Sequence, residues 1–321
     1  MNKTIITALA AILPLVSCTN RSPQAGEPAL CREVIAVEGE HPSLLPADKK
    51  FKLIWNDEFN GSALDESKWY YRTDFWMRRA HWYAAPEDNA VELRDGLAYL
   101  KIVKLPDGRY VTPQLQTSHL IWDYQHEDAE RSTVWPVKKL LPAKFKHAFG
   151  YYECRCRLQQ MPGWWSAFWM QSESIGVSPD PRYAGIEHDI MESFDPGFII
   201  RSCYHYNGYG DDHVEFSSPR SVGGKKAPRQ EVDKEVFHTF GLLWEKDGYT
   251  PYLDGVARGP KVGCEGDEAV SWIPEFILLT TEARWFRKNN GTGPAHPELE
   301  AAYQAGDAFI VDYVRVFDIA Q

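Results

Sequence analysis

The chain has 321 residues, a formal net charge of −10 at pH 7 and an aromatic content of 13%. The acidic balance argues against nucleic acid as a partner, because a phosphate backbone is bound by basic surfaces. The length allows one large domain or two smaller ones.

The first 18 residues have the pattern of a targeting segment. Lys3 is followed by an apolar stretch over residues 5–16, which is too short to span a bilayer. Leu15-Val16-Ser17-Cys18 resembles the lipobox of bacterial lipoproteins, which implies cleavage before Cys18 and lipidation of its thiol. The alternative is an ordinary signal peptide beside a chance cysteine. We expect contact with a bacterial membrane through the lipid anchor only, at the outer membrane or the cell surface.

Residues 19–45 are rich in Ser, Pro, Gly, Ala and Glu, a composition typical of a flexible tether. The remaining residues, 46–321, are then the folded domain. Within them, short alternating runs such as 97–103 and 313–316 stand between turn signals such as Pro106-Asp107-Gly108. No long segment with helical periodicity is apparent, so the sequence predicts an all-β sandwich.

Five cysteines remain after Cys18, so they cannot all pair within one chain. Cys154 and Cys156 lie on one face of an expected strand, where a direct disulfide is geometrically awkward. We interpret both as small buried apolar residues.

An apolar strand with three carboxylates is the most informative segment. Glu187 and Asp189 share a face because side chains alternate along a strand, whereas Glu192 has the wrong parity. A one-residue bulge at Ile190-Met191 would bring Glu192 to the same face, and bulges are common beside active sites. Such a strand could bring two glutamates to the carboxylate separation that a retaining glycosidase needs. The alternative is a strand with acids on its solvent face, which does not explain the apolar flanks.

Glu187-x-Asp189-x-x-Glu192 resembles the bulged signature of glycoside hydrolase family 16, which includes laminarinases and agarases. Further segments resemble the family's strands in the same order. They are residues 55–61, 68–69, 150–158, 165–170, 237–240, Trp244, 252–255 and 309–316. The resemblance covers about residues 51–318 and implies a concanavalin-like jelly roll of two curved antiparallel sheets with the cleft on the concave face.

The resemblance also implies roles for the acids. Glu187 would be the nucleophile, needing hydrogen-bond donors to stay ionised, and Glu192 the acid/base with a raised pKa. Asp189 would hold Glu187 and couple the two titrations. No cofactor is expected for catalysis. His188 has the opposite parity, so we expect a hydrogen-bonded histidine behind the strand.

Sugar rings stack on aromatic side chains, so aromatic residues near the acids are candidates for substrate contact. Of Trp164, Trp165 and Trp169, at least one is expected in the core, because β-sandwiches bury large aromatic residues. The family resemblance places a histidine beside the acid/base and a tryptophan at the end of a late strand. The candidates are Trp82, Asn89, Trp164, Trp165, Trp169, His205 and Trp285.

The resemblance predicts retaining endo-hydrolysis of a β-linked polysaccharide by a monomer, through a glycosyl-enzyme intermediate. Glu282-Ala283-Arg284-Trp285 departs from the laminarinase pattern, so β-1,3-glucan and β-galactan, neutral or sulfated, both remain open. Arg78, Arg79, Arg284 and Arg287 could bind sulfate or simply cover aromatic surface. A non-catalytic carbohydrate-binding lipoprotein and a transglycosylase are the alternatives.

Many family members bind one structural Ca²⁺ through an aspartate in the closing strand, which corresponds to Asp312. An ion pair of Asp312 with a neighbouring basic residue is the alternative.

Overall fold

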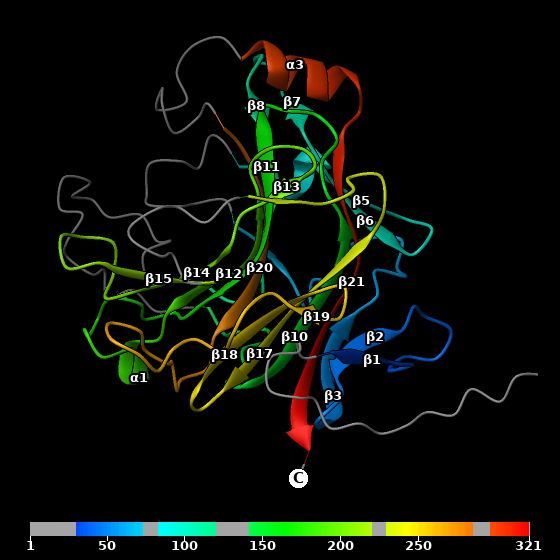
Figure 1. Cartoon of the computed structure of the whole chain (residues 1–321). Coiled ribbons are helices and arrows are strands. Elements are labelled where there is room, and N and C mark those ends of the chain that lie inside the picture. Colours follow the sequence, from blue (N-terminus) through cyan, green and yellow to red (C-terminus); the bar gives the residue numbers. More distant parts are fainter. Residues whose placement is uncertain (1–29, 73–82, 120–140, 220–228, 285–295, 321) are drawn as a thin grey trace, which may run out of the picture.

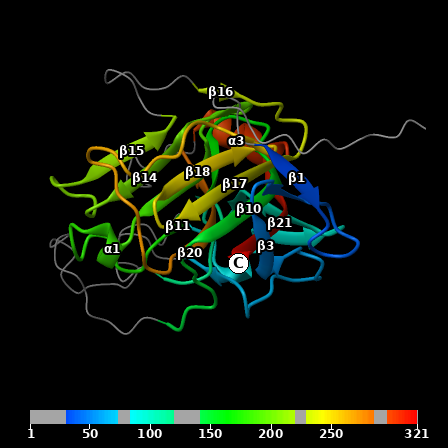
Figure 2. The same cartoon turned by 60° about the horizontal axis from the view of Figure 1, so that its bottom comes forward.

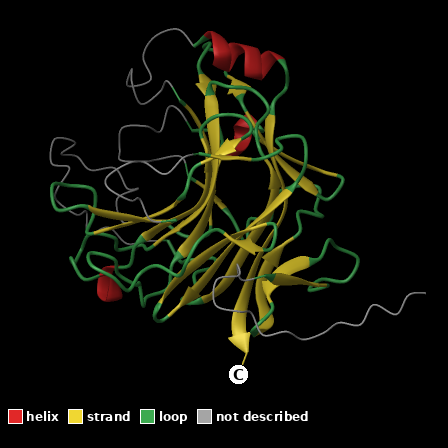
Figure 3. Ribbon diagram, viewed as in Figure 1, coloured by secondary structure: helices red, strands yellow, loops and turns green. Residues whose placement is uncertain are grey.

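The computed structural model describes residues 30–72, 83–119, 141–219, 229–284 and 296–320 (Figure 1). Two large antiparallel sheets pack face to face, and helices are few and short (Figure 3). The predicted jelly-roll β-sandwich is confirmed.

The first sheet has eight strands, with β21 near its centre. Its order is β19-β18-β17-β10-β21-β6-β5, and β3 pairs with β21 as well; the neighbours β18, β17, β10 and β21 are visible in Figure 2. The strands are β3 (Lys50–Asp57), β5 (Val91–Arg94), β6 (Leu97–Lys101), β10 (Gly150–Arg157), β17 (His238–Glu245), β18 (Gly248–Leu253), β19 (Val256–Ala257) and β21 (Ala308–Ala320).

The second sheet has seven strands in the order β15-β14-β12-β11-β20-β9-β4. The acidic strand β12 is therefore an interior strand, paired on both sides. The strands are β4 (Tyr70–Tyr71), β9 (Gln114–Gln116), β11 (Trp164–Gln171), β12 (Glu187–Ser193), β14 (Ser202–Tyr206), β15 (Val214–Ser218) and β20 (Phe276–Ala283).

Smaller elements connect and cover these sheets. Three two-stranded ribbons pair β1 with β2, β7 with β8, and β13 with β16. They comprise β1 (Cys31–Val34), β2 (Ser43–Pro46), β7 (Val103–Lys104), β8 (Tyr110–Val111), β13 (Phe198–Ile199) and β16 (Gln230–Glu231), and the helices are η2 (Pro86–Asp88), α1 (Pro181–Ala184) and α3 (Pro297–Gln304).

The main core lies between the two sheets and follows the alternation of strand side chains. Tyr152, Cys154 and Cys156 of β10 all point into it and are fully buried. The five cysteines of the described chain, residues 31, 154, 156, 203 and 264, are free thiols. The interpretation of Cys154 and Cys156 as small buried apolar residues is confirmed.

The tether predicted at residues 19–45 is wrong from residue 30 onward, because this segment folds onto the outer face of the eight-stranded sheet. Leu45 is 3% exposed and belongs to a second apolar cluster with Tyr151 and Phe317. Two charged residues on that face, Glu153 and Arg315, also need partners. Leu44 donates its backbone N–H to Glu153 at 2.8 Å, and Arg315 donates to Ser43 Oγ at 2.8 Å. Composition alone did not reveal these contacts.

Candidate active site

A bulge in β12 places all three acids on one face of the strand. Phe168 of β11 pairs with Met191, but the next residue, Trp169, pairs with Asp189, so Ile190 has no partner in the register. The bulge predicted at this point is confirmed. Its consequence is that Glu192 regains the parity of Glu187 and Asp189.

The three acids open into a cavity of about 410 Å³. Three of the predicted aromatic and histidine residues on the neighbouring strands line this cavity: Trp165, Trp169 and His205. The other side of β12 faces the core, where Ile190 and Met191 are buried.

Close contacts determine the backbone position at the start of β12. Gly185 caps the end of helix α1; its φ of +72° suits glycine, and a Cβ there would lie 2.2 Å from Ser172 Cβ. Glu275 Oε1 accepts the backbone N–H of Ile186 at 2.9 Å. The backbone just before Glu187 is thus held by the close approach of Gly185 to Ser172 and by the hydrogen bond from Ile186 to Glu275.

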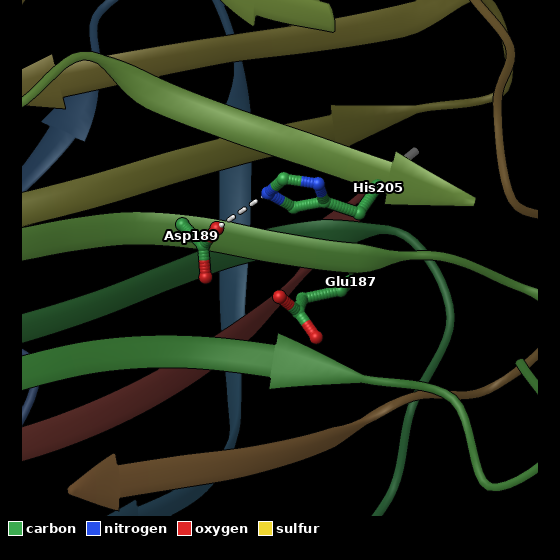
Figure 4. Close-up of side chains that lie close together, drawn as sticks. All are labelled: Glu187, Asp189 and His205. Atoms are coloured by element: carbon green, nitrogen blue, oxygen red, sulfur yellow. Dashed lines mark hydrogen bonds and ion pairs between the residues drawn. The ribbon is translucent and has the colours of Figure 1, made fainter. Parts of the chain in front are cut away.

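Asp189 pairs with His205 of β14. His205 Nε2 lies 3.1 Å from Asp189 Oδ2 (Figure 4). Its Nδ1 lies 2.9 Å from His213 Nε2. Burial alone lowers the pKa of His205, but the hydrogen bond and charge of Asp189 outweigh this and raise it to about 9. Burial and the charge of His205 lower the pKa of His213. An imidazolium at His205 therefore donates to Asp189 and to a neutral His213.

Glu187 is held by two donors on the same oxygen. Gln171 Nε2 donates to Glu187 Oε2 at 2.8 Å, and the Tyr209 hydroxyl donates to this oxygen as well. Burial, and then the charge of Asp189, raise the pKa of Glu187 to about 7, although His205, Tyr209 and Arg72 act in the opposite direction. The donors that the sequence required beside Glu187 are present.

Two tryptophans give the cavity an aromatic wall. Trp169 Nε1 donates to Thr280 Oγ1 at 2.9 Å, and the Arg72 guanidinium lies 5.8 Å from the centre of its ring. The Trp165 ring packs at 5.3 Å from Phe194. Both indoles are therefore fixed by neighbours while lining the space beside the acids.

One predicted sugar contact, Trp164, is wrong, and another, Asn89, lies away from the cavity. Trp164 is fully buried, and its Nε1 donates to Asp307 at 2.9 Å, because its parity along β11 directs it into the core. Asn89 caps helix η2 with φ 53° and donates to the Glu87 carbonyl; it does not line the cavity. Trp82, Trp285 and Cys18 lie outside the described residues.

The contacts of Asp312 do not favour the predicted calcium site. Arg155 Nη1 donates to Asp312 Oδ2 at 2.5 Å, and Asp312 is 7% exposed. A guanidinium on this carboxylate competes with a cation for the same oxygens. The alternative of an ion pair with a basic neighbour is the one observed.

Glu187, Asp189 and His205 are the one group in the described part of the chain whose potential ligand atoms all lie within 4.8 Å of one another. A metal would need the Nε2 lone pair of a neutral imidazole. That nitrogen carries the proton shared with Asp189, so we interpret the group as a hydrogen-bonded acid–imidazole network.

Several lining residues were not found in the sequence. Tyr209 and His213 come from the β14–β15 connection, where no motif marks them, although they closely follow His205. Glu282 was noted only as a departure from a pattern. The residues missed are Arg72, Tyr83, Gln114, Phe194, Tyr209, His213 and Thr280.

Comparison with known proteins finds similarity to one family of glycosyl hydrolases. The family model described as "Glycosyl hydrolases family 16" matches residues 132–262. Glucan endo-1,3-beta-glucosidase A1 of Niallia circulans is 28% identical over 85% of this chain, and beta-porphyranase E of Zobellia galactanivorans is 26% identical over 63%. The chain spans 38% of the length of the first relative and 65% of the second.

Among solved structures, SCLam, a non-specific endo-beta-1,3(4)-glucanase from family GH16, superposes with a TM-score of 0.58. The match covers 92% of this chain and 98% of that one at 23% identity, and it supports the fold. None of the described helices is long and apolar enough to span a membrane.

Proposed function

We propose that this chain is a family 16 glycosyl hydrolase and a retaining endo-β-glycosidase acting on a polysaccharide. The observation that carries this proposal is the bulged strand β12. It presents Glu187, Asp189 and Glu192 together to a cavity with an aromatic wall. No cofactor is needed for such a reaction.

In the first step, an oxygen of Glu187 bonds to the anomeric carbon while the bond from that carbon to the leaving oxygen breaks. Glu192 gives its proton to the leaving oxygen. In the second step, Glu192 takes a proton from water, the water oxygen bonds to the anomeric carbon, and the ester bond to Glu187 breaks. The negative charge of Asp189 raises the pKa of Glu187, and the positive charge of His205 lowers it.

The substrate class within this proposal is a β-1,3-glucan or a β-galactan. The two relatives named above are called a 1,3-glucanase and a porphyranase, so similarity supports both classes. Glu282, which is 4% exposed, adds a fourth carboxylate to the cavity and favours neutral sugars there. Arg284 forms an ion pair with Asp195 at 2.5 Å and does not line the cavity. Arg78, Arg79 and Arg287 lie outside the described residues.

Incubation with laminarin, lichenan, agarose, porphyran and carrageenan tests the proposal. We expect one or two of them to lose viscosity before reducing ends accumulate, as endo-cleavage requires. Proton NMR of the first product should give the retained anomer. An inverted first product, or binding without hydrolysis of any of the five, would contradict the proposal. Transfer of the glycosyl group to sugar in preference to water would identify the transglycosylase alternative.

We also propose that Cys18 anchors the enzyme to a bacterial membrane, facing outward, because long polysaccharides must be cut before uptake. Cys18→Ala should move the protein from the membrane fraction to the soluble fraction without loss of specific activity. A variant that stays wholly in the membrane fraction would contradict a lipid anchor at this residue.

A further inference from the structure

We propose that Tyr209 is a positioning residue of the reaction: with Gln171 it binds Glu187 Oε2 and so leaves Oε1 as the attacking oxygen. This inference rests on the proposed function, in which Glu187 is the nucleophile. It goes further by assigning distinct roles to the two oxygens and a role to a residue of the β14–β15 connection.

The contacts converge on one atom from two separate elements. Gln171 ends β11, and its Nε2 donates to Glu187 Oε2 at 2.8 Å and also to the Tyr209 oxygen. The Tyr209 hydroxyl uses its single proton to donate to the same Oε2. Burial and the charge of Glu187 raise the pKa of Tyr209 well above its ordinary value, so the phenol keeps this proton at neutral pH.

The Tyr209 ring is fixed on two sides. The His213 ring stacks on it at a centroid distance of 6.0 Å, and the same His213 ring stacks on His205 at 5.1 Å. Tyr209 also packs with Trp169 against a buried apolar cluster of residues 175, 276 and 278. The turn that carries it is closed by Asn207 Nδ2, which donates to the Asp212 carbonyl at 2.8 Å. A donor held this way keeps its direction as substrate enters.

The hydrogen bonds from Gln171 and Tyr209 to Glu187 change in strength between the two steps of the reaction. When Oε1 bonds to the anomeric carbon, the charge of Glu187 disappears and Oε2 becomes an ester carbonyl, so the hydrogen bonds to it weaken. When the ester bond breaks, the charge returns and the same bonds strengthen. Tyr209 therefore favours ionised Glu187 at rest and favours its departure as a leaving carboxylate.

Other charged and titratable groups also face Glu187, and Tyr209→Phe removes none of them. They come from its own strand, the β14–β15 hairpin, the end of β4 and β20: Asp189, Glu192, His205, His213, Arg72 and Glu282. A shift in the titration of Glu187 on removal of one hydroxyl is therefore assigned to that hydroxyl.

The test compares Tyr209→Phe with Tyr206→Phe. Tyr206 belongs to the same hairpin, but its hydroxyl donates to the Asp267 carbonyl at 2.6 Å, away from Glu187. Labelling by a water-soluble carbodiimide, read by peptide mass spectrometry across pH, follows protonation of Glu187 without any substrate. We expect Tyr209→Phe to raise the midpoint by about one pH unit, a tenfold change in the protonation equilibrium. Tyr206→Phe should leave it unchanged.

Kinetics on the polysaccharide that the panel selects provide the second readout. Tyr209→Phe should slow breakdown of the glycosyl-enzyme more than its formation, so kcat and KM fall together and a burst appears. An unchanged labelling midpoint, or equal loss of kcat at unchanged KM with a lowered melting temperature, would overturn the role of Tyr209. Inactivity of the unaltered enzyme on every polysaccharide, together with a shifted midpoint, would overturn the proposed function alone.

Discussion

Strand β12 contributes one member to a carboxylate–histidine pair on each of its faces, and the two pairs have different surroundings. On the cavity face, Asp189 pairs with His205 at 3.1 Å. On the core face, His188 Nε2 lies 2.7 Å from Glu275 Oε2, and both side chains are fully buried. The core ring is enclosed by Tyr249, Trp244 and Tyr204 at centroid distances of 4.6, 5.1 and 5.7 Å.

The surroundings of each pair decide its role. The core pair binds the N–H of Ile186 through the second oxygen of Glu275, so it fixes the start of the strand. The cavity pair sets the charge next to Glu187. We therefore expect changes in the core pair to alter stability and changes on the cavity face to alter activity and its pH dependence.

The largest effect is expected on the cavity face from Glu187→Gln. An amide is neither anionic nor a competent leaving group, so kcat/KM should fall by roughly 10⁴-fold or more, as for other removed nucleophiles. The fold should not suffer. Because the folded pKa of about 7 lies above the ordinary 4.5, this carboxyl's contribution to stability falls as pH rises from 4.5 through 7.

Thermal unfolding of Glu187→Gln at several pH values tests whether the Glu187 carboxyl destabilises the fold as pH rises. Above pH 7, Glu187→Gln should be more stable than the unaltered protein, by about 1–2 kcal/mol for a group that still touches solvent. Near pH 4 the two should coincide. A variant that is less stable at pH 8 would contradict the electrostatic description of this face.

The next effect is expected from Glu192→Ala. Loss of the acid/base should lower kcat by about 10²–10⁴-fold on a polysaccharide, because general acid catalysis contributes about this much. An aryl glycoside with a good leaving group needs little protonation and should lose far less. Added azide should restore turnover by attacking the intermediate from the water side. Equal losses on both substrates without azide rescue would remove Glu192 from this role.

On the core face, we expect Glu275→Leu to cost about 3–5 kcal/mol, the usual range when one member of a buried pair is removed. Ile186 N–H would lose its acceptor, and His188 would lose its buried carboxylate neighbour. Chemical denaturation measures the loss, and Glu275→Gln, which retains an acceptor for Ile186, should lose less. The pH profile of the residual activity should keep its shape. A shifted acid limb would show that the two faces are not separable.

The smallest effect is expected from His205→Asn. The imidazolium lowers the pKa of Glu187, so its removal should raise that pKa and move the acid limb of kcat/KM upward by about one pH unit. His238 is a suitable control, since it pairs with Asp254 at 2.6 Å and lies outside the cavity lining. His238→Asn should leave the limb in place. An identical shift in both variants would point to a general charge effect.

The sequence predicted the sandwich, the bulge and the face of the three acids, because strand parity and apolar flanks are local properties of the chain. It also placed His188 behind the strand, and its acidic partner there, Glu275, is 87 positions away in sequence; only the fold pairs them. Residue identity could not separate Trp164 from Trp165, since a one-residue change of parity decides between core and cavity.

Other parts of the site depend on contacts between distant segments. Tyr209 reaches Glu187 because the β14–β15 connection folds over the strand, and Arg72 enters from the end of β4. The docking of residues 30–46 depends on charged groups of β10 and β21 that need partners. None of these leaves a local signature in the chain.

Covalent trapping tests the central claim, that Glu187 on the cavity face is the nucleophile of a retaining reaction. The enzyme would be incubated with a 2-deoxy-2-fluoro β-glycosyl fluoride of the sugar that the panel identifies, digested, and examined by peptide mass spectrometry. We predict one fluoroglycosyl adduct, located on Glu187 and absent from Glu187→Gln. An adduct on Glu192 or Asp189, or no adduct from an enzyme that hydrolyses the parent polysaccharide with inversion, would contradict the claim.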